Sequence, residues 1–127
     1  MTHWAAAYIG QPWDPANQHC WGFARTVWRD VFGLDVPEVS IDGASPYAAR
    51  RAFSQGHDGW LPVTEPVEGD AVLMARGQRP CHVGVWITPS PRAGVLHSVE
   101  RAGVVFTPPV RLADIGFNIV GIYRRLA

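Results

Sequence analysis

The sequence predicts an α+β domain in which helices from the first part of the chain pack on an antiparallel sheet formed by the second part. Residues 20–32 repeat apolar side chains at three- and four-residue spacing, as a helix does. After Gly59 come short stretches rich in Val and Ile and separated by Gly or Pro, which is typical of consecutive strands. The chain of 127 residues is long enough for one core and too short for two, so residues 1–127 are expected to form a single domain.

The helix at residues 20–32 is expected to bury one face against the sheet. Its apolar stripe consists of Phe23, Ala24, Val27, Trp28, Val31 and Phe32. Gly33 follows, and glycine readily takes the left-handed conformation that ends a helix. A short helix is also expected at residues 2–10, with Thr2 as its N-cap and Gly10 just past its end. Another is expected from Pro46 to about Gln55.

Five stretches in the second half are predicted to be strands of one antiparallel sheet of five to six strands. Each is short, rich in β-branched residues and bounded by turn residues. They are residues 70–75, 82–87, 94–99, 103–108 and 119–125.

Composition excludes several classes of function. The 47% of hydrophobic residues argues against disorder. Eleven basic residues balance eleven acidic ones, so we expect no nucleic-acid partner. No apolar run approaches the roughly 18 residues of a membrane span, and the N-terminus lacks the pattern of a signal peptide. We therefore expect no membrane insertion, synthesis in the cytoplasm and no export signal of the chain's own.

Two histidines of the predicted sheet are expected to be neighbours. If residues 88–91 form a hairpin loop, Ile87 faces Arg92, and counting outward places His82 directly opposite His97. A bulge in this loop would instead shift the register by one residue and send one ring to the other face.

Cys20 stands where the central helix begins. If this helix packs on the face that carries the two imidazoles, the helix dipole and an imidazolium would both favour thiolate over thiol. One imidazole would then take the thiol proton, and the other would orient it. The alternative is that Cys20 is a small buried hydrophobe and that each histidine is structural.

The remaining cysteine, Cys81, is expected to be structural. It precedes His82 in a strand, so its side chain should point to the opposite face, toward the core. The adjacent pairs His19-Cys20 and Cys81-His82 lack the usual spacing of zinc ligands, and we expect no metal site.

The chain resembles the NlpC-type cysteine peptidases of bacterial cell-wall turnover. The resemblance rests on "YIGQPW", "HCWGFARTVW", "EGDAVLM", "PCHVGVWI", "VLHSV" and "VGIYRR", and it covers nearly the whole chain. It implies a compact papain-like fold, with Cys20 as nucleophile, His82 as base and His97 as the residue that orients the base. The motifs are most similar to stand-alone members found beside phage and prophage tail genes.

Four further residues are candidates for substrate binding. Trp13 and Trp21 flank the nucleophile and could form a groove wall, while Gly22 and Gly84 could leave room for a substrate chain. Two positions depart from the family pattern: His19 replaces the usual Asp before the nucleophile, and Trp13 stands where many relatives have a tyrosine.

The resemblance implies a peptidase that acts on the stem peptide of peptidoglycan, at the bond after D-glutamate, without a cofactor. It also implies a place in the tail tip of a phage particle, with tail-tip proteins as partners and the cell wall as the site of action. Two alternatives remain: a structural tail-tip or tail-assembly protein with weak or lost activity, and an amidase toxin of a contractile secretion system.

Overall fold

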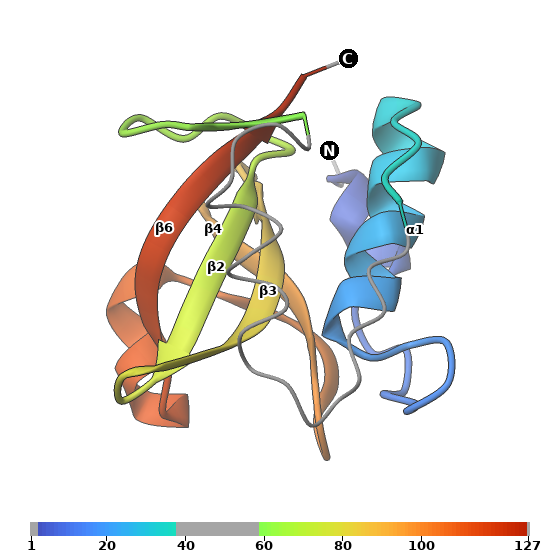
Figure 1. The fold of residues 1–127 in the computed structure, drawn as a ribbon. Coiled ribbons are helices and arrows are strands. Elements are labelled where there is room, and N and C mark those ends of the chain that lie inside the picture. Colours follow the sequence, from blue (N-terminus) through green and yellow to red (C-terminus); the bar gives the residue numbers. More distant parts are fainter. Residues whose placement is uncertain (1–2, 38–58, 127) are drawn as a thin grey trace.

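The computed structural model describes residues 3–37 and 59–126. In this part of the chain a six-stranded antiparallel sheet carries the helix α1 (Cys20–Phe32) on one face, which confirms the α+β prediction. Figure 1 shows α1 on one side of the sheet and the helical turn η2 (Pro109–Ile115) at its other side. The short helix η1 (Trp4–Ala7) lies near α1, and Trp4 packs edge-to-face on Phe32.

The sheet has the strand order β1-β6-β2-β3-β4-β5. The strands are β1 (Trp60–Pro62), β2 (Ala71–Arg76), β3 (Arg79–Ile87), β4 (Gly94–Val99), β5 (Gly103–Thr107) and β6 (Asn118–Arg125). The five predicted strands are all present, with ends that differ by at most three residues. The short edge strand β1 and the turn η2 were not expected from the sequence.

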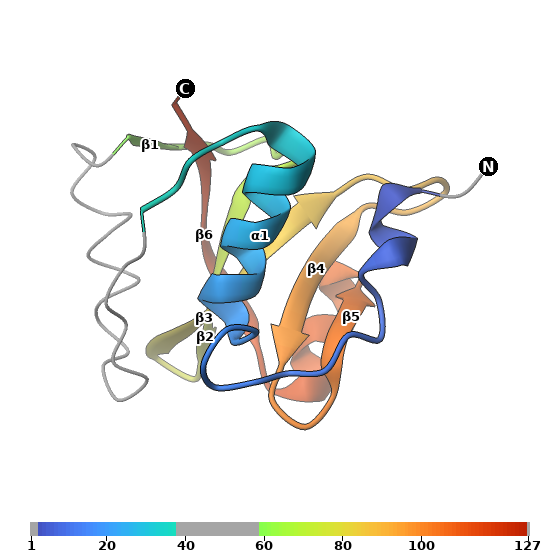
Figure 2. The same ribbon diagram turned by 90° about the vertical axis from the view of Figure 1, so that its right-hand side faces the viewer.

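The helix α1 begins and ends where the sequence indicates. Gly33 takes the left-handed conformation with φ of 66°, and its N–H donates to the carbonyl of Arg29 while that of Leu34 donates to Trp28. Phe23 and Val27 are fully buried against the sheet, as expected. In Figure 2, α1 lies in front of the sheet, and its contacts with the strands are concentrated on β3 and β4.

Hydrophobic side chains fill both faces of the sheet. On the α1 face they include Leu73, Val83, Val85 and Leu96. On the opposite face they form a second cluster of Val72, Met74, Val95, Val99, Leu112 and Phe117. The central strands β2, β3 and β4 are therefore buried on both sides, which explains why they read as nearly continuous apolar runs.

The first helical segment differs from its prediction. It is the 3₁₀ helix η1, and its N-cap is His3, whose side chain accepts a hydrogen bond from the N–H of Ala5. Thr2, the expected cap, and the helix expected from Pro46 to Gln55 lie outside the described residues.

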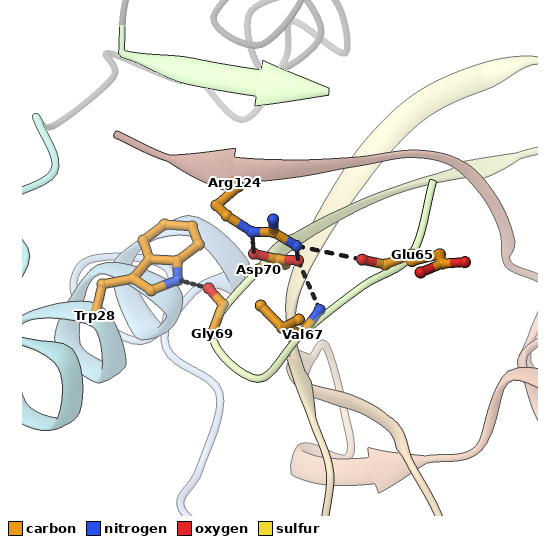
Figure 3. A network of polar contacts seen from close by, with 6 residues as sticks. All are labelled: Trp28, Glu65, Val67, Gly69, Asp70 and Arg124. Atoms are coloured by element: carbon orange, nitrogen blue, oxygen red, sulfur yellow. Dashed lines mark hydrogen bonds and ion pairs between the residues drawn. The ribbon is translucent and has the colours of Figure 1, made fainter. Parts of the chain in front are cut away.

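The turn before β2 is fastened to both α1 and β6 (Figure 3). Gly69 has a φ of 101°, and its carbonyl accepts a hydrogen bond of 2.8 Å from the indole N–H of Trp28. The buried carboxylate of Asp70 accepts two hydrogen bonds from the guanidinium of Arg124 and one from the N–H of Val67. The Gly-Asp pair is therefore a structural joint between helix and sheet.

Among the described residues, we find no helix that is both long and apolar enough to span a membrane.

Candidate active site

Two imidazoles and a hydroxyl form a buried chain across three strands. Nε2 of His82 on β3 and Nδ1 of His97 on β4 share a hydrogen bond of 2.8 Å. The other ring nitrogen of His97, Nε2, lies 2.9 Å from Oγ1 of Thr107 on β5. His82 is 7% exposed, His97 is 0% exposed and Thr107 is 7% exposed, so bulk water does not compete for these contacts.

The strand register differs from the one expected. Ile87 faces Gly94 rather than Arg92, so the connection between β3 and β4 is two residues longer. Continuing this register places Gly84, not His82, opposite His97, and the two histidines are diagonal neighbours. Because side chains alternate with a period of two, a shift of two positions keeps both rings on the same face. The expected contact therefore forms although the register was wrong.

The imidazoles lie on the sheet face opposite to α1. His82 faces Met74 across the β2–β3 ladder and stacks on the ring of Phe117, with centroids 4.4 Å apart. His97 faces Val105, which packs in the same cluster. The expectation that α1 packs on the histidine face is thus wrong, because the odd-numbered residues of β3, Val83 and Val85, are the ones that meet the helix.

The thiol of Cys20 reaches β3 where its ladder with β4 has ended. The pairing of the two strands stops at Val85 and Leu96, although both strands continue. The N–H of Trp86 donates to the carbonyl of Asp70, and its C=O accepts from the N–H of Gly69, so both groups of Trp86 point toward β2. Since this direction alternates along a strand, Val83 directs its N–H toward β4, where no partner strand takes it. That N–H donates to the sulfur of Cys20 instead.

The sulfur of Cys20 therefore lies beside the backbone amide of Val83, the residue that follows His82. The hydrogen bond of the His82 ring is the one to His97, and among the described residues none joins the sulfur to the imidazole. The ring nitrogen of His82 that does not contact His97 is Nδ1. Nδ1 is also the ring nitrogen nearer to the strand backbone. The structure thus brings His82 and His97 together and brings the thiol of Cys20 to the backbone amide of Val83.

Burial raises the pKa of the Cys20 thiol above its ordinary value. The N–H groups of Val83, Trp21 and Cys20 lower this pKa in part, and the nearby thiol of Cys81 raises it further. The expected shift toward thiolate is therefore wrong. The helix start does supply N–H donors, but the cost of burying the anion is larger.

Both histidines are held neutral. Burial, the neighbouring His97 and the guanidinium of Arg76 place the pKa of His82 well below its usual value. Burial lowers the pKa of His97 to about 4. The thiol and both imidazoles are thus uncharged in the resting state near neutral pH.

The start of α1 is positioned by its cap and by β4. Nδ1 of His19 accepts a hydrogen bond of 3.1 Å from the N–H of Gly22, so His19 caps the helix as an aspartate would. The hydroxyl of buried Ser98 donates to the carbonyl of Gln18 at 2.6 Å. These two contacts fix the loop from which Cys20 projects.

A side chain at either candidate glycine would strike the protein itself. A Cβ at Gly22 would lie 2.6 Å from the carbonyl oxygen of Asn17. A Cβ at Gly84 would lie 2.4 Å from Cγ1 of Val95 and 3.0 Å from Cβ of His97. Both glycines therefore allow close packing of the chain, and the expectation that Gly84 leaves room for substrate is corrected accordingly. Gly22 also lines a cavity beside α1, so its role in substrate binding stays a prediction.

The two candidate tryptophans have different surroundings. Trp21 is 1% exposed and packs edge-to-face on Trp28, so most of its ring belongs to the core. Trp21 also lines a cavity beside α1, and its role in substrate binding stays a prediction. Trp13 is half-buried in the loop before α1, and its role in substrate binding stays a prediction. A cavity of about 340 Å³ lies between α1, this loop and residues 34–36, and Cys20 is not among its lining residues.

Cys81 is exposed, contrary to the expectation of a core residue. Met74 faces His82 but Ala75 faces Pro80, so Cys81 is the extra residue of a β-bulge at the start of β3. A bulged residue outside the regular alternation is not directed into the core. Among the described residues, no group of three or more His, Cys, Asp or Glu side chains is arranged to hold a metal ion.

Sequence reasoning missed Thr107 and Phe117. Thr107 is the last residue of β5, and its alternation with Val105 would have placed it on the histidine face once the β4–β5 pairing was known. Phe117 lies between η2 and β6, and its ring stacks on that of His82. No local sequence pattern predicts this contact.

Neither protein-family models nor curated proteins give a match to this chain.

Proposed function

We propose that the protein is a cysteine amidohydrolase with Cys20 as nucleophile, His82 as base and His97 as the residue that orients the base. The observation that carries this proposal is the 2.8 Å bond between His82 and His97 beside the backbone amide that contacts the Cys20 sulfur. His82 and His97 would supply the base and the orienting group, and Cys20 the nucleophile; these are the three parts that covalent catalysis of acyl transfer requires.

The chemistry starts from the neutral pair. As the sulfur attacks the carbonyl carbon of an amide, the thiol proton passes to Nδ1 of His82. The imidazolium so formed donates from Nε2 to Nδ1 of His97, which accepts because His97 is itself neutral. His82 then returns the proton to the leaving amine as the carbon–nitrogen bond breaks, and water hydrolyses the thioester.

The proposed substrate is the stem peptide of peptidoglycan, cleaved after D-glutamate. The support for this choice is the resemblance of the Cys20, His82 and His97 motifs to the NlpC-type peptidases. The same resemblance supports a place in a phage tail tip, where the enzyme would open the wall for DNA entry.

The test is digestion of purified sacculi, with released muropeptides measured by mass spectrometry. The wild type should release soluble muropeptides and Cys20→Ala should not, while circular dichroism shows both to be folded. Cys81→Ala is the matched control, because it removes the other thiol and should retain activity. Identical muropeptide profiles for folded wild type and Cys20→Ala would exclude the enzymatic proposal.

One observation favours a second candidate, a tail-tip or tail-assembly protein with weak or lost activity. Burial raises the pKa of Cys20, which lowers the thiolate population on which attack depends. In that case the wild type releases no muropeptides from sacculi in the same digestion. The Cys20→Ala variant then copurifies with tail particles in the same amount as the wild type.

A further inference from the structure

Thr107 ends the buried polar chain and stands where it can control the protons of both imidazoles. Its Oγ1 lies 2.9 Å from Nε2 of His97, whose Nδ1 in turn lies 2.8 Å from Nε2 of His82. The three side chains come from β5, β4 and β3 and share one face of the sheet. Each contact joins groups at most 7% exposed, so an unmatched donor or acceptor here would not find bulk water.

The two neutral imidazoles have two consistent proton arrangements. In the first, His97 carries its proton on Nε2 and donates to the hydroxyl oxygen of Thr107. Its bare Nδ1 then accepts from Nε2–H of His82, and Nδ1 of His82 has a free lone pair. In the second, the Thr107 hydroxyl donates to Nε2 of His97, Nδ1–H of His97 donates to His82, and the proton of His82 sits on Nδ1.

These arrangements differ in chemistry. Only the first leaves Nδ1 of His82 able to receive a thiol proton, and only in the first can His97 accept from the imidazolium that results. The role of the Thr107 hydroxyl is tied to this choice, because a neutral imidazole that donates from Nε2 must accept at Nδ1.

We propose that Thr107 is a positioning residue that accepts the hydrogen bond of His97 Nε2–H and thereby holds His82 in the tautomer with a free Nδ1. The role in catalysis rests on the proposed function, whereas the tautomer itself does not. A hydroxyl suits this task because its oxygen accepts the hydrogen bond and carries no charge. A carboxylate in its place would stabilise an imidazolium rather than the neutral ring.

The experiment is ¹⁵N NMR of the histidine rings at pH 7.5, which distinguishes protonated from bare ring nitrogens without any substrate. We expect the wild type to have His97 protonated at Nε2 and His82 at Nε2. Thr107→Ser keeps the hydroxyl and should give the same pattern. Thr107→Val keeps the shape, removes the acceptor and should transfer the proton of His97 toward Nδ1.

A wild-type spectrum with the His97 proton on Nδ1 would overturn the proposal, and so would an unchanged pattern in folded Thr107→Val. Where Thr107→Val does not fold, the spectra of the wild type and Thr107→Ser decide: His97 protonated at Nε2 in both supports the proposal, and any other pattern overturns it.

Turnover supplies an independent readout. In Thr107→Val, kcat should fall about tenfold or more with KM unchanged, while Thr107→Ser and the exposed control Thr88→Val stay near the wild type. Expected tautomers without any turnover would contradict the proposed function and leave the tautomer assignment standing.

Discussion

Gly84 leaves the space into which His97 packs, since a Cβ at position 84 would lie 3.0 Å from Cβ of His97 and 2.4 Å from Cγ1 of Val95. Gly84→Ala should therefore lower the free energy of unfolding by about 1–3 kcal/mol through overpacking and should lengthen the His82–His97 contact. Urea denaturation and the imidazole NMR signals measure the two effects.

Val95→Ala is the matched control for this substitution, because it removes the atom that the new Cβ would strike. The double variant Gly84→Ala/Val95→Ala should lose less stability than the sum of the two single losses. Simple additivity would mean that Val95 is not what makes glycine necessary at position 84.

The pH dependence of stability should report the two neutral histidines. Their folded pKa values are lowered, to about 4 for His97 from the usual 6.5, so the unfolded chain binds more protons between these values. Their contribution is fully present above pH 6.5 and is lost as the pH falls toward 4, with about 3 kcal/mol from His97. Urea denaturation between pH 7.5 and pH 5 measures the slope.

His97→Gln is the control, because it removes one titrating group and retains a polar side chain. Its free energy of unfolding should change less steeply over the same pH range. Equal slopes in wild type and variant would show that His97 does not titrate with a lowered pKa.

Iodoacetamide should label Cys81 before Cys20 in the folded protein at pH 8. Cys81 is exposed, whereas burial raises the pKa of Cys20 and reduces its thiolate fraction. Peptide mapping after brief labelling separates the two sites, and urea-unfolded protein should show nearly equal rates. Faster labelling of Cys20 in the folded state would contradict the neutral resting thiol.

His19→Ala should lower the free energy of unfolding by about 0.5–2 kcal/mol, because it removes the N-cap acceptor for Gly22 N–H. His19→Asp should restore the stability, since a carboxylate accepts the same hydrogen bond and interacts favourably with the helix dipole. Thermal unfolding compares the three proteins. Equal stability of His19→Ala and the wild type would show that the cap contributes nothing.

Asp70→Ala should lower the melting temperature more than Asp114→Ala. Asp70 is buried and bonds both Arg124 and the N–H of Val67, whereas the Arg111–Asp114 pair is exposed and its atoms are 3.4 Å apart. Thermal unfolding followed by circular dichroism checks the order. A larger loss of melting temperature in Asp114→Ala than in Asp70→Ala would show that the Gly-Asp turn is not a structural joint.

The sequence by itself determined the elements, because their signals are local. The three- and four-residue spacing from Phe23 to Phe32 and the glycine at position 33 define α1 with its observed C-terminal cap. Alternating turn residues and β-branched runs define five of the six strands found in residues 3–37 and 59–126. That Cys20 starts the helix, and that His82 and His97 lie on strands, also follows from these local patterns.

The tertiary structure alone decided how these residues meet. The register of β3 and β4 depends on the loop conformation at residues 88–93, and the side of the sheet that α1 covers depends on which face offers the better packing. The bulge at Cys81 and the partner of His97 arise from contacts between distant strands. The direction of the Cys20 pKa shift depends on burial, which no spacing of residues encodes, and it reversed the expectation drawn from the helix dipole.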